Sequence, residues 1–173
     1  MISDIFYPRY AVGMKMSTGV EWAMHCCVSL GQATEPVPAA RLAELHGVPT
    51  AYLAKHLQAL SRTGIVRSVP GPAGGYVLTR PAARITMAQV VEAVDGAESA
   101  FRCTEIRRNG PLGLPAKSCR TRCAVHRAMD AADAAWRTAL AGVTIADLAA
   151  SIDADSSGTA LSEVREWLTG GAR

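Results

Sequence analysis

The placement of the cysteines is the first feature of this sequence that suggests chemistry. The chain has five cysteines, an odd number that does not suit a disulfide framework, and a reducing compartment would keep them as thiols. Cys26 and Cys27 lie early, in a stretch whose apolar spacing predicts a buried helix. Cys103, Cys119 and Cys123 form a later group. We expect metal binding or redox chemistry from this later group.

A carboxylate and an imidazole could complete a metal site with these thiols. Glu21 and His25 are four residues apart, so in a helix both side chains project from one face, with Trp22 alongside. With Cys103 and Cys123 they supply four donors, which suit tetrahedral zinc or a [2Fe–2S] cluster with a histidine ligand. Each residue also has an ordinary structural role: Thr18 and Glu21 predict a capping box that opens a helix, and the other residues could fill a core. The donor types alone leave these alternatives open.

Charge is distributed unevenly along the chain. The net charge is +3, but residues 41–84 carry six basic residues and one acid, a local net charge of +5. From residue 151 onwards the acids outnumber the bases by four to two. A local positive field of this size attracts a polyanion such as nucleic acid. A solvated basic face without a partner remains the alternative.

Helical periodicity places the basic segment in a helix-turn-helix. Apolar spacing predicts helices over residues 18–30, 38–46 and 50–63. Gly47 ends the second helix, and Val48 and Pro49 form a tight corner into the third. The second member of such a pair normally enters the major groove of DNA. Two β-prone runs follow, joined by a glycine-rich tip, which predicts a hairpin. The expected fold is therefore mostly α with a small β-hairpin wing, a winged helix-turn-helix.

The second half of the chain predicts an irregular loop and a long helix. Thr86 and Gln89 predict a capping box that opens a helix ending near Val94. The long loop that follows, over residues 95–118, is of a kind that is usually functional or disordered. An alanine-rich helical period then runs from Cys119 to Leu140, and two shorter helices follow.

The stretch from Pro49 to Pro81 resembles the Rrf-type family of bacterial winged-helix transcription regulators. The residues that carry the resemblance are Tyr52-Leu53, Leu60, Gly64-Ile65-Val66, Ser68 and Gly71-x-x-Gly74-Gly75-Tyr76. The similarity extends from Met14 to about Ile152. It implies a homodimer built on the long helix, a palindromic double-stranded DNA operator and, in many members, an iron–sulfur cluster held by the loop before that helix.

On this basis we divide the chain into five parts. They are a loose N-terminal arm (1–13), a winged-helix DNA-binding domain (14–95), a cluster-binding loop (96–118), a dimerisation helix with a short following helix (119–152), and a linker with a C-terminal amphipathic helix (153–173).

The predicted DNA contacts lie on the third helix and around the wing. The third helix presents polar, small and basic side chains away from its leucine stripe, at Thr50, Ala51, Tyr52, Lys55 and His56. These types suit contacts with base edges and phosphates in a major groove. Arg41, Arg67, Gly74 and Gly75 are predicted to contact the backbone or allow its close approach. Thr50 could instead cap the helix, Tyr52 could be half buried, and a plain hairpin also needs glycines.

Within the family, residues 19–26 and 103–107 are most similar to redox-sensitive members. This similarity implies a [2Fe–2S] cluster bound by Glu21 and His25 of one subunit and by Cys103 and Cys123 of the other. It also implies that the packing of Trp22 changes with the redox state.

A second ligand set comes from other cluster-binding relatives, most of which place three cysteines in this loop. Cys103, Cys119, Cys123 and His126 could take that part here, although the first gap is longer than in those relatives. Zinc, a disulfide or no metal are the remaining alternatives.

The function expected from the sequence is that of a cytoplasmic transcription regulator, a repressor, whose operator binding depends on the redox state of the cluster. The alternatives are a cluster-free regulator that senses oxidants or nitric oxide through its cysteines, a zinc-stabilised regulator, and a small electron-transfer or thiol–disulfide protein. The sequence contains no catalytic triad, P-loop or dinucleotide fingerprint, so we expect no enzyme. We also expect no membrane span and no secretion signal.

Overall fold

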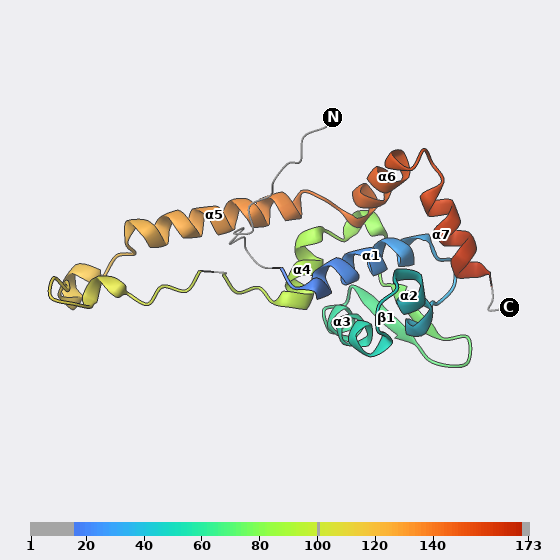
Figure 1. Ribbon diagram of the computed structural model, residues 1–173, viewed down its shortest axis with the longest axis horizontal. Coiled ribbons are helices and arrows are strands. Elements are labelled where there is room, and N and C mark those ends of the chain that lie inside the picture. Colours follow the sequence, from blue (N-terminus) through green and yellow to red (C-terminus); the bar gives the residue numbers. More distant parts are fainter. Residues whose placement is uncertain (1–15, 100, 171–173) are drawn as a thin grey trace, which may run out of the picture.

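The computed structural model describes residues 16–99 and 101–170, so the arm predicted over residues 1–13 lies outside the described residues. The helices are α1 (Thr18–Gln32), α2 (Ala39–His46), α3 (Thr50–Arg62), α4 (Met87–Asp95), α5 (Ala124–Ala141), α6 (Ile145–Asp155) and α7 (Ala160–Thr169), and the strands are β1 (Val66–Val69) and β2 (Gly75–Leu78). Short 3-10 turns cover Ala82–Arg84, Ile106–Arg108 and Ala116–Cys119. This mostly helical chain with one antiparallel hairpin confirms the predicted winged-helix fold (Figure 1).

Helix α1 forms the centre of the hydrophobic core. It packs against α3, α4 and α6, and the leucine stripe of α3 is fully buried beneath it. Cys26 and Cys27 are also fully buried, which confirms that they belong to the core. Burial raises the pKa of both thiols to about 12, because a thiolate would lose its hydration there.

The start of α1 differs from the predicted capping box of Thr18 and Glu21. Ser17 occupies the N-cap position, and α1 has no side-chain cap hydrogen bond. The backbone N–H of Ser17 instead donates to the carboxylate of Asp95, at the end of α4, over 2.9 Å. The capping prediction was therefore wrong, because a tertiary contact replaces the local one. As a result, the carboxylate of Glu21 is exposed and unused by any hydrogen bond among the described residues.

The wing is joined to the helix-turn-helix by a short bridge that the sequence did not predict. In the hairpin, Val66 pairs with Leu78 and Val69 pairs with Gly75. Val37, just before α2, forms an isolated bridge with Tyr76, with N–O distances of 3.0 and 2.8 Å. The wing therefore has a fixed position relative to α2.

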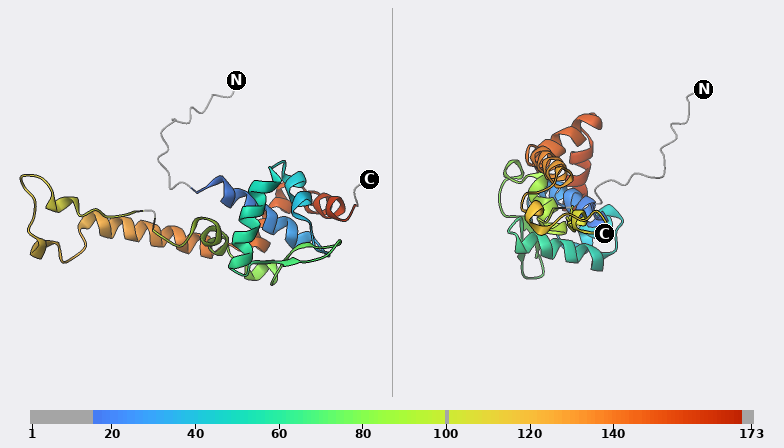
Figure 2. Two further views of the ribbon diagram at one scale, coloured as in Figure 1. Left: turned by 90° about the horizontal axis from the view of Figure 1, so that it is seen from below. Right: turned by 90° about the vertical axis from the view of Figure 1, so that its left-hand side faces the viewer.

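Helix α5 and the loop before it project from the rest of the molecule. We call α5 together with residues 101–123 the stalk, and the remaining described elements the head. Figures 1 and 2 show the loop running out along α5 and turning back at its far end. The helix begins at Ala124, with Cys123 as its N-cap, so the predicted start at Cys119 was too early. No residue of α5 is buried, and Val125 is 64% exposed although it is apolar. Among the described helices, none is long and apolar enough to cross a membrane.

Candidate metal centre and DNA-binding surface

Cys103 and Cys123, the two predicted thiolate ligands, line one cavity on the stalk. The cavity has a volume of about 420 Å³ and lies where the loop meets the N-terminus of α5. The backbone N–H of Glu105 donates to Sγ of Cys103 over 3.4 Å, and that of His126 donates to Sγ of Cys123 over 3.3 Å. Such N–H groups hold both sulfur atoms in place and complement the negative charge of a metal-bound thiolate. The two residues therefore fit the role of cluster ligands.

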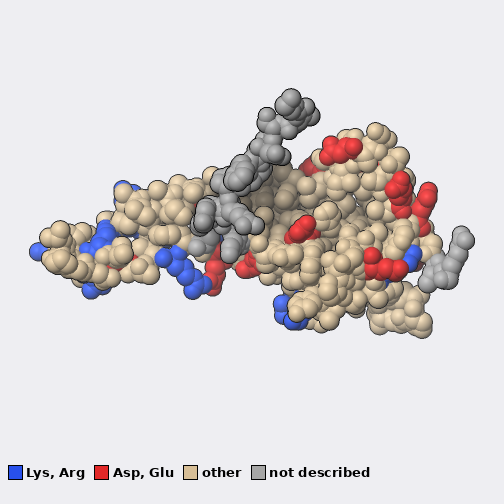
Figure 3. Space-filling model, in the orientation of Figure 1, with Lys and Arg blue, Asp and Glu red and all other residues tan. Residues whose placement is uncertain are grey.

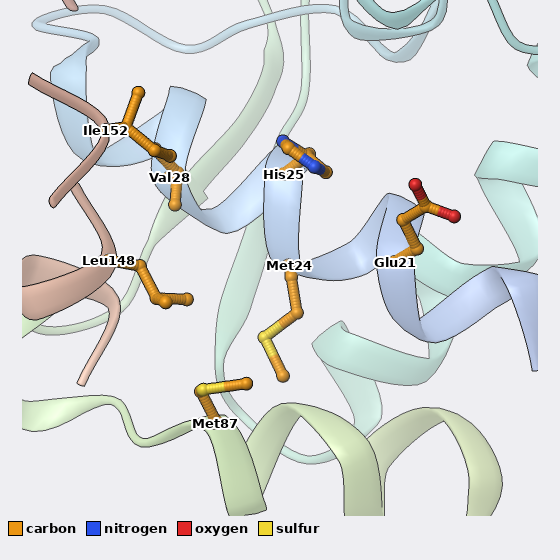
Figure 4. Close-up of a pocket in the computed structure, with 7 residues that line it drawn as sticks. All are labelled: Glu21, Met24, His25, Val28, Met87, Leu148 and Ile152. Carbon is orange, nitrogen blue, oxygen red and sulfur yellow. The ribbon is translucent and has the colours of Figure 1, made fainter. Parts of the chain in front are cut away.

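Glu21 and His25, the other two predicted ligands, lie on the head. Both side chains are exposed and project from successive turns of α1 (Figure 4). They border an apolar hollow of about 230 Å³ between α1, α4 and α6. The rest of its lining consists of Met24, Val28, Met87, Leu148 and Ile152. A carboxylate and an imidazole at the rim of an open apolar hollow are accessible to a group that approaches from outside.

Within one chain the two ligand pairs do not form one site. The cavity on the stalk and the hollow on the head have no lining residue in common, and the stalk extends away from the head (Figure 1). The prediction placed these pairs on different subunits. It therefore stays a prediction for the assembled protein.

Three potential metal ligands on the stalk, Cys103 among them, come together within one chain. One ligand atom each from Cys103, Glu105 and His126 lies within 4.8 Å of the others. Cys103 and His126 belong to the second predicted set, whereas Cys119 is not part of this group. Glu105 was missed by sequence reasoning. The C-x-E spacing in the sequence was a weak sign of it, but its backbone conformation, with φ of 51°, is visible only in the structure.

His46 is a second residue that sequence reasoning missed. It ends α2, and its ring centroid lies 5.8 Å from that of His25 on α1. Nε2 of His46 lies 3.2 Å from Oγ of the buried Ser29. Burial lowers the pKa of His46, and the neighbouring His25 lowers it further. The ligand face of α1 is therefore in contact with the end of the first helix of the helix-turn-helix.

The predicted recognition face of α3 is mostly open to solvent. Thr50, Ala51, Tyr52 and Lys55 are exposed, and the Lys55 ammonium lies 5.2 Å from the centre of the Tyr52 ring. Arg67 is exposed on β1. A hydroxyl, a methyl group, a phenol and two cations are thus presented on one helix and the neighbouring strand, which suits groove and phosphate contacts.

His56 faces the core side of α3 instead. Its ring is partly buried and meets Trp22 of α1 edge to face, with the centroids 5.9 Å apart. We therefore assign His56 to the α1–α3 contact and leave it out of the DNA surface proposed below.

Gly74 and Gly75 are required by the wing itself. A Cβ atom at Gly74 would lie 2.2 Å from the carbonyl oxygen of Val69, and one at Gly75 would lie 2.3 Å from the carbonyl carbon of Val37. Real Cβ atoms do not approach backbone atoms so closely. The hairpin and its bridge to residue 37 therefore explain both glycines, whether or not DNA also approaches them.

Arg41, predicted as a phosphate contact, is engaged by the C-terminal helix. Its guanidinium stacks over the Trp167 ring at 3.4 Å and donates to the carbonyl oxygens of Trp167 and Gly170 over 2.5 and 2.7 Å. It also pairs with Glu44. These contacts satisfy most of its donors, so we leave Arg41 out of the proposed DNA surface.

Besides the basic segment of residues 41–84, two other regions of the molecule are strongly charged. Residues 101–127 contain seven basic residues and one acid, and Figure 3 shows basic side chains along the stalk. Acidic side chains gather at the opposite end of the molecule, where α6 and α7 lie (Figure 3). The positive stalk surrounds the thiols, where it would offset the negative charge of a thiolate-ligated group.

Comparison with known proteins places this architecture in a family. Residues 16–151 match the model of the Rrf2 family, described as iron-dependent transcriptional regulators. Over 76 residues the chain is 43% identical to the HTH-type transcriptional regulator IscR of Xenorhabdus nematophila and 41% identical to that of Klebsiella pneumoniae. These matches cover 44% of this chain, and 46% and 47% of those proteins, so the chain aligns with slightly less than half of each relative.

Solved structures agree with this assignment at the level of the fold. The global cysteine regulator CymR of B. subtilis is 25% identical, with a TM-score of 0.59 over 79% of this chain and 96% of that one. IscR of T. potens is 23% identical, with a TM-score of 0.61 over 85% of this chain and 93% of that one. Since the family model matches most of the chain, this protein belongs to the Rrf2 family.

Proposed function

We propose that this protein is a homodimeric transcription repressor that binds a palindromic operator and is controlled by the redox state of a [2Fe–2S] cluster. The observation that carries the proposal is the position of α1. The same helix bears Glu21 and His25 on its open face and packs against the recognition helix through Trp22 and His56. A movement of Glu21 or His25 could therefore be transmitted to α3 through the contact between Trp22 and His56.

The proposed DNA surface consists of the exposed residues of α3 and β1. Thr50, Ala51 and Tyr52 lie at the start of α3, where a recognition helix meets base edges, and Lys55 and Arg67 are placed to neutralise phosphates. The bridge between Val37 and Tyr76 fixes the wing against the helix-turn-helix. The helix and the wing can therefore bind as one unit.

The proposed ligands are Cys103 and Cys123 of one subunit with Glu21 and His25 of the other. When bound, the cluster supplies a one-electron redox centre whose potential depends on its ligands and surroundings. The N–H donors of Glu105 and His126 fix the thiolates, and the basic stalk offsets their charge. The ring of His25 lies 5.8 Å from that of His46, so a change in the position of the His25 ring would alter the packing at the end of α2.

The stalk supports the proposal of a dimer. Helix α5 is amphipathic, yet none of its residues is buried and Met129 is 41% exposed. At the C-terminal end of this 18-residue helix Trp136 and Leu140 pack against the head, but Val125 and Met129 are uncovered, and a second helix over them would stabilise the outer part of α5. A second copy of α5 would do so, and would bring the stalk of one subunit towards the head of the other.

The test is to measure operator binding by the same protein in two redox states. Protein purified without air should contain about two irons and two sulfides per subunit, the content of one [2Fe–2S] cluster. We expect the oxidised and the reduced form to differ in operator affinity by about tenfold or more, a coupling of about 1.4 kcal/mol. Equal affinities in the two states, with the cluster intact, would contradict redox control of operator binding. The proposal that the protein binds DNA would still stand.

A further inference from the structure

The stalk contains a group of metal-binding side chains that differs from the proposed cluster site. One ligand atom from each of Cys103, Glu105 and His126 lies within 4.8 Å of the other two, all within one chain. We propose that these three residues bind a single divalent transition-metal ion, with zinc as the preferred ion, when the protein carries no cluster. A thiolate, a carboxylate and an imidazole are the ligands that zinc takes in tetrahedral sites, and water can fill the fourth position.

Each thiolate or carboxylate ligand is held in place by a neighbouring group. Sγ of Cys103 accepts the backbone N–H of Glu105 over 3.4 Å. One carboxylate oxygen of Glu105 accepts two hydrogen bonds from the Arg107 guanidinium, over 2.9 and 3.1 Å. The other oxygen faces Sγ of Cys103 at 3.8 Å. One oxygen therefore anchors the side chain and the other remains for a metal ion.

His126 has the arrangement that metal-binding histidines typically show. Its Nε2 faces the carboxylate of Asp130, one turn along α5, at 3.5 Å. Its Nδ1 is buried and has no hydrogen-bond partner in the described part of the chain. An unsatisfied buried nitrogen destabilises the folded chain, and a bond to a metal ion would remove that cost. A carboxylate on one ring nitrogen and a metal on the other is a common pairing in metalloproteins.

The backbone at Glu105 gives an independent sign that this loop is built around a site. Glu105 has φ of 51°, in the left-handed region that residues with side chains rarely adopt. This conformation turns the chain so that its N–H meets the sulfur of Cys103 while its carboxylate meets Arg107. Such local strain is usually retained at binding sites.

The zinc site does not depend on the proposed cluster, but the two share Cys103. A single thiolate cannot serve both at once, so zinc should block cluster assembly and an assembled cluster should exclude zinc. The remaining ligands differ: Glu105 and His126 belong to the zinc site, whereas Glu21 and His25 belong to the proposed cluster site.

The experiment is a cobalt titration of the reduced, cluster-free full chain. Cobalt is the probe because a tetrahedral Co²⁺ site with a thiolate ligand absorbs visible light and shows sulfur-to-cobalt charge transfer. We expect about one Co²⁺ per chain, displaced by an equal amount of zinc. Asp130→Asn removes a supporting group and should weaken binding by about 10–100-fold, and Glu105→Gln and His126→Ala remove direct ligands and should weaken it more.

Glu21→Gln and His25→Ala are the matched controls and should leave the cobalt spectrum unchanged. The opposite pattern, in which His25→Ala removes the spectrum and His126→Ala does not, would overturn the proposal and place the ion at the other donor set. Binding without sulfur-to-cobalt charge transfer would also overturn it. Circular dichroism of each variant shows that the fold is intact. Iron and sulfide content of the unmodified protein purified without air reports separately on the proposed function, because the cobalt titration uses cluster-free protein.

Discussion

The imidazole of His56 lies directly over Gly19, at the point where α3, the proposed recognition helix, crosses α1. A Cβ atom added at Gly19 would lie 2.1 Å from Cε1 of His56, so only glycine allows this approach. The same ring contacts Trp22 edge to face. The helix that carries Glu21 and His25 is therefore in close contact with α3 at this crossing.

Gly19→Ala should weaken this contact. His56 would have to leave its position against Trp22, and we expect the free energy of unfolding to fall by about 1 kcal/mol or more, as in other overpacked contacts. Gly31→Ala on the same helix is the control, because its Cβ would meet the nearest atom at 3.6 Å, an ordinary contact. That variant should gain about 0.5–1 kcal/mol from helix propensity. Urea denaturation measures both, and equal effects would contradict the packing account.

Lys55→Ala should reduce the salt dependence of operator binding. Each phosphate contact contributes about one to the slope of log affinity against log salt concentration, so the slope should fall by about one. Arg41→Ala is the comparison, because the Arg41 guanidinium is bound to Trp167 and Gly170. We expect it to lower the melting temperature and leave the slope unchanged. A reduced slope in Arg41→Ala would return Arg41 to the DNA surface.

The five thiols should differ in their reaction with an alkylating reagent. Burial raises the pKa of Cys26 and Cys27 to about 12, so at pH 8 both remain protonated and unreactive. In the cluster-free protein we expect rapid modification of the partly exposed Cys103, Cys119 and Cys123. Mass spectrometry after a short exposure should find three modified cysteines. Early modification of Cys26 or Cys27 would show that the core opens readily.

The fold could be predicted well because local and periodic signals specify it. The leucine stripe of α3, the glycines of the wing and the capping box of Thr86 and Gln89 are all visible in the sequence, and the structure contains each of them. The cap of α1 could not be predicted, because Ser17 binds Asp95 from a distant helix.

The candidate sites were less predictable, because their members lie far apart in the chain. Arg41 contacts Trp167, which lies more than a hundred residues further along the chain. The edge-to-face contact of His56 with Trp22 depends on how two helices cross. Glu105 lies close to Cys103 and His126 because its backbone has an unusual positive φ angle. Spacing rules describe residues within one element, so they found Glu21 with His25 but not these tertiary contacts.

In the proposed cluster site, His25 and Glu21, rather than Cys119 and His126, complete the set of ligands. Both His25 and Glu21 are exposed, so replacing either with alanine should leave the fold intact. Loss of a direct ligand should cost more than the 10–100-fold that loss of a supporting group typically costs. Cys103→Ala and Cys123→Ala are uninformative here, because both ligand sets contain these residues.

The most direct measurement is the absorption spectrum and iron content of anaerobically purified variants. We predict that His25→Ala and Glu21→Ala lose the cluster or alter its spectrum strongly, whereas Cys119→Ala and His126→Ala retain the spectrum and iron content of the unmodified protein. If Cys119→Ala instead bleaches the protein and His25→Ala leaves its spectrum unchanged, the ligands lie within the stalk, and the proposed path from the cluster through α1 to the DNA surface is wrong.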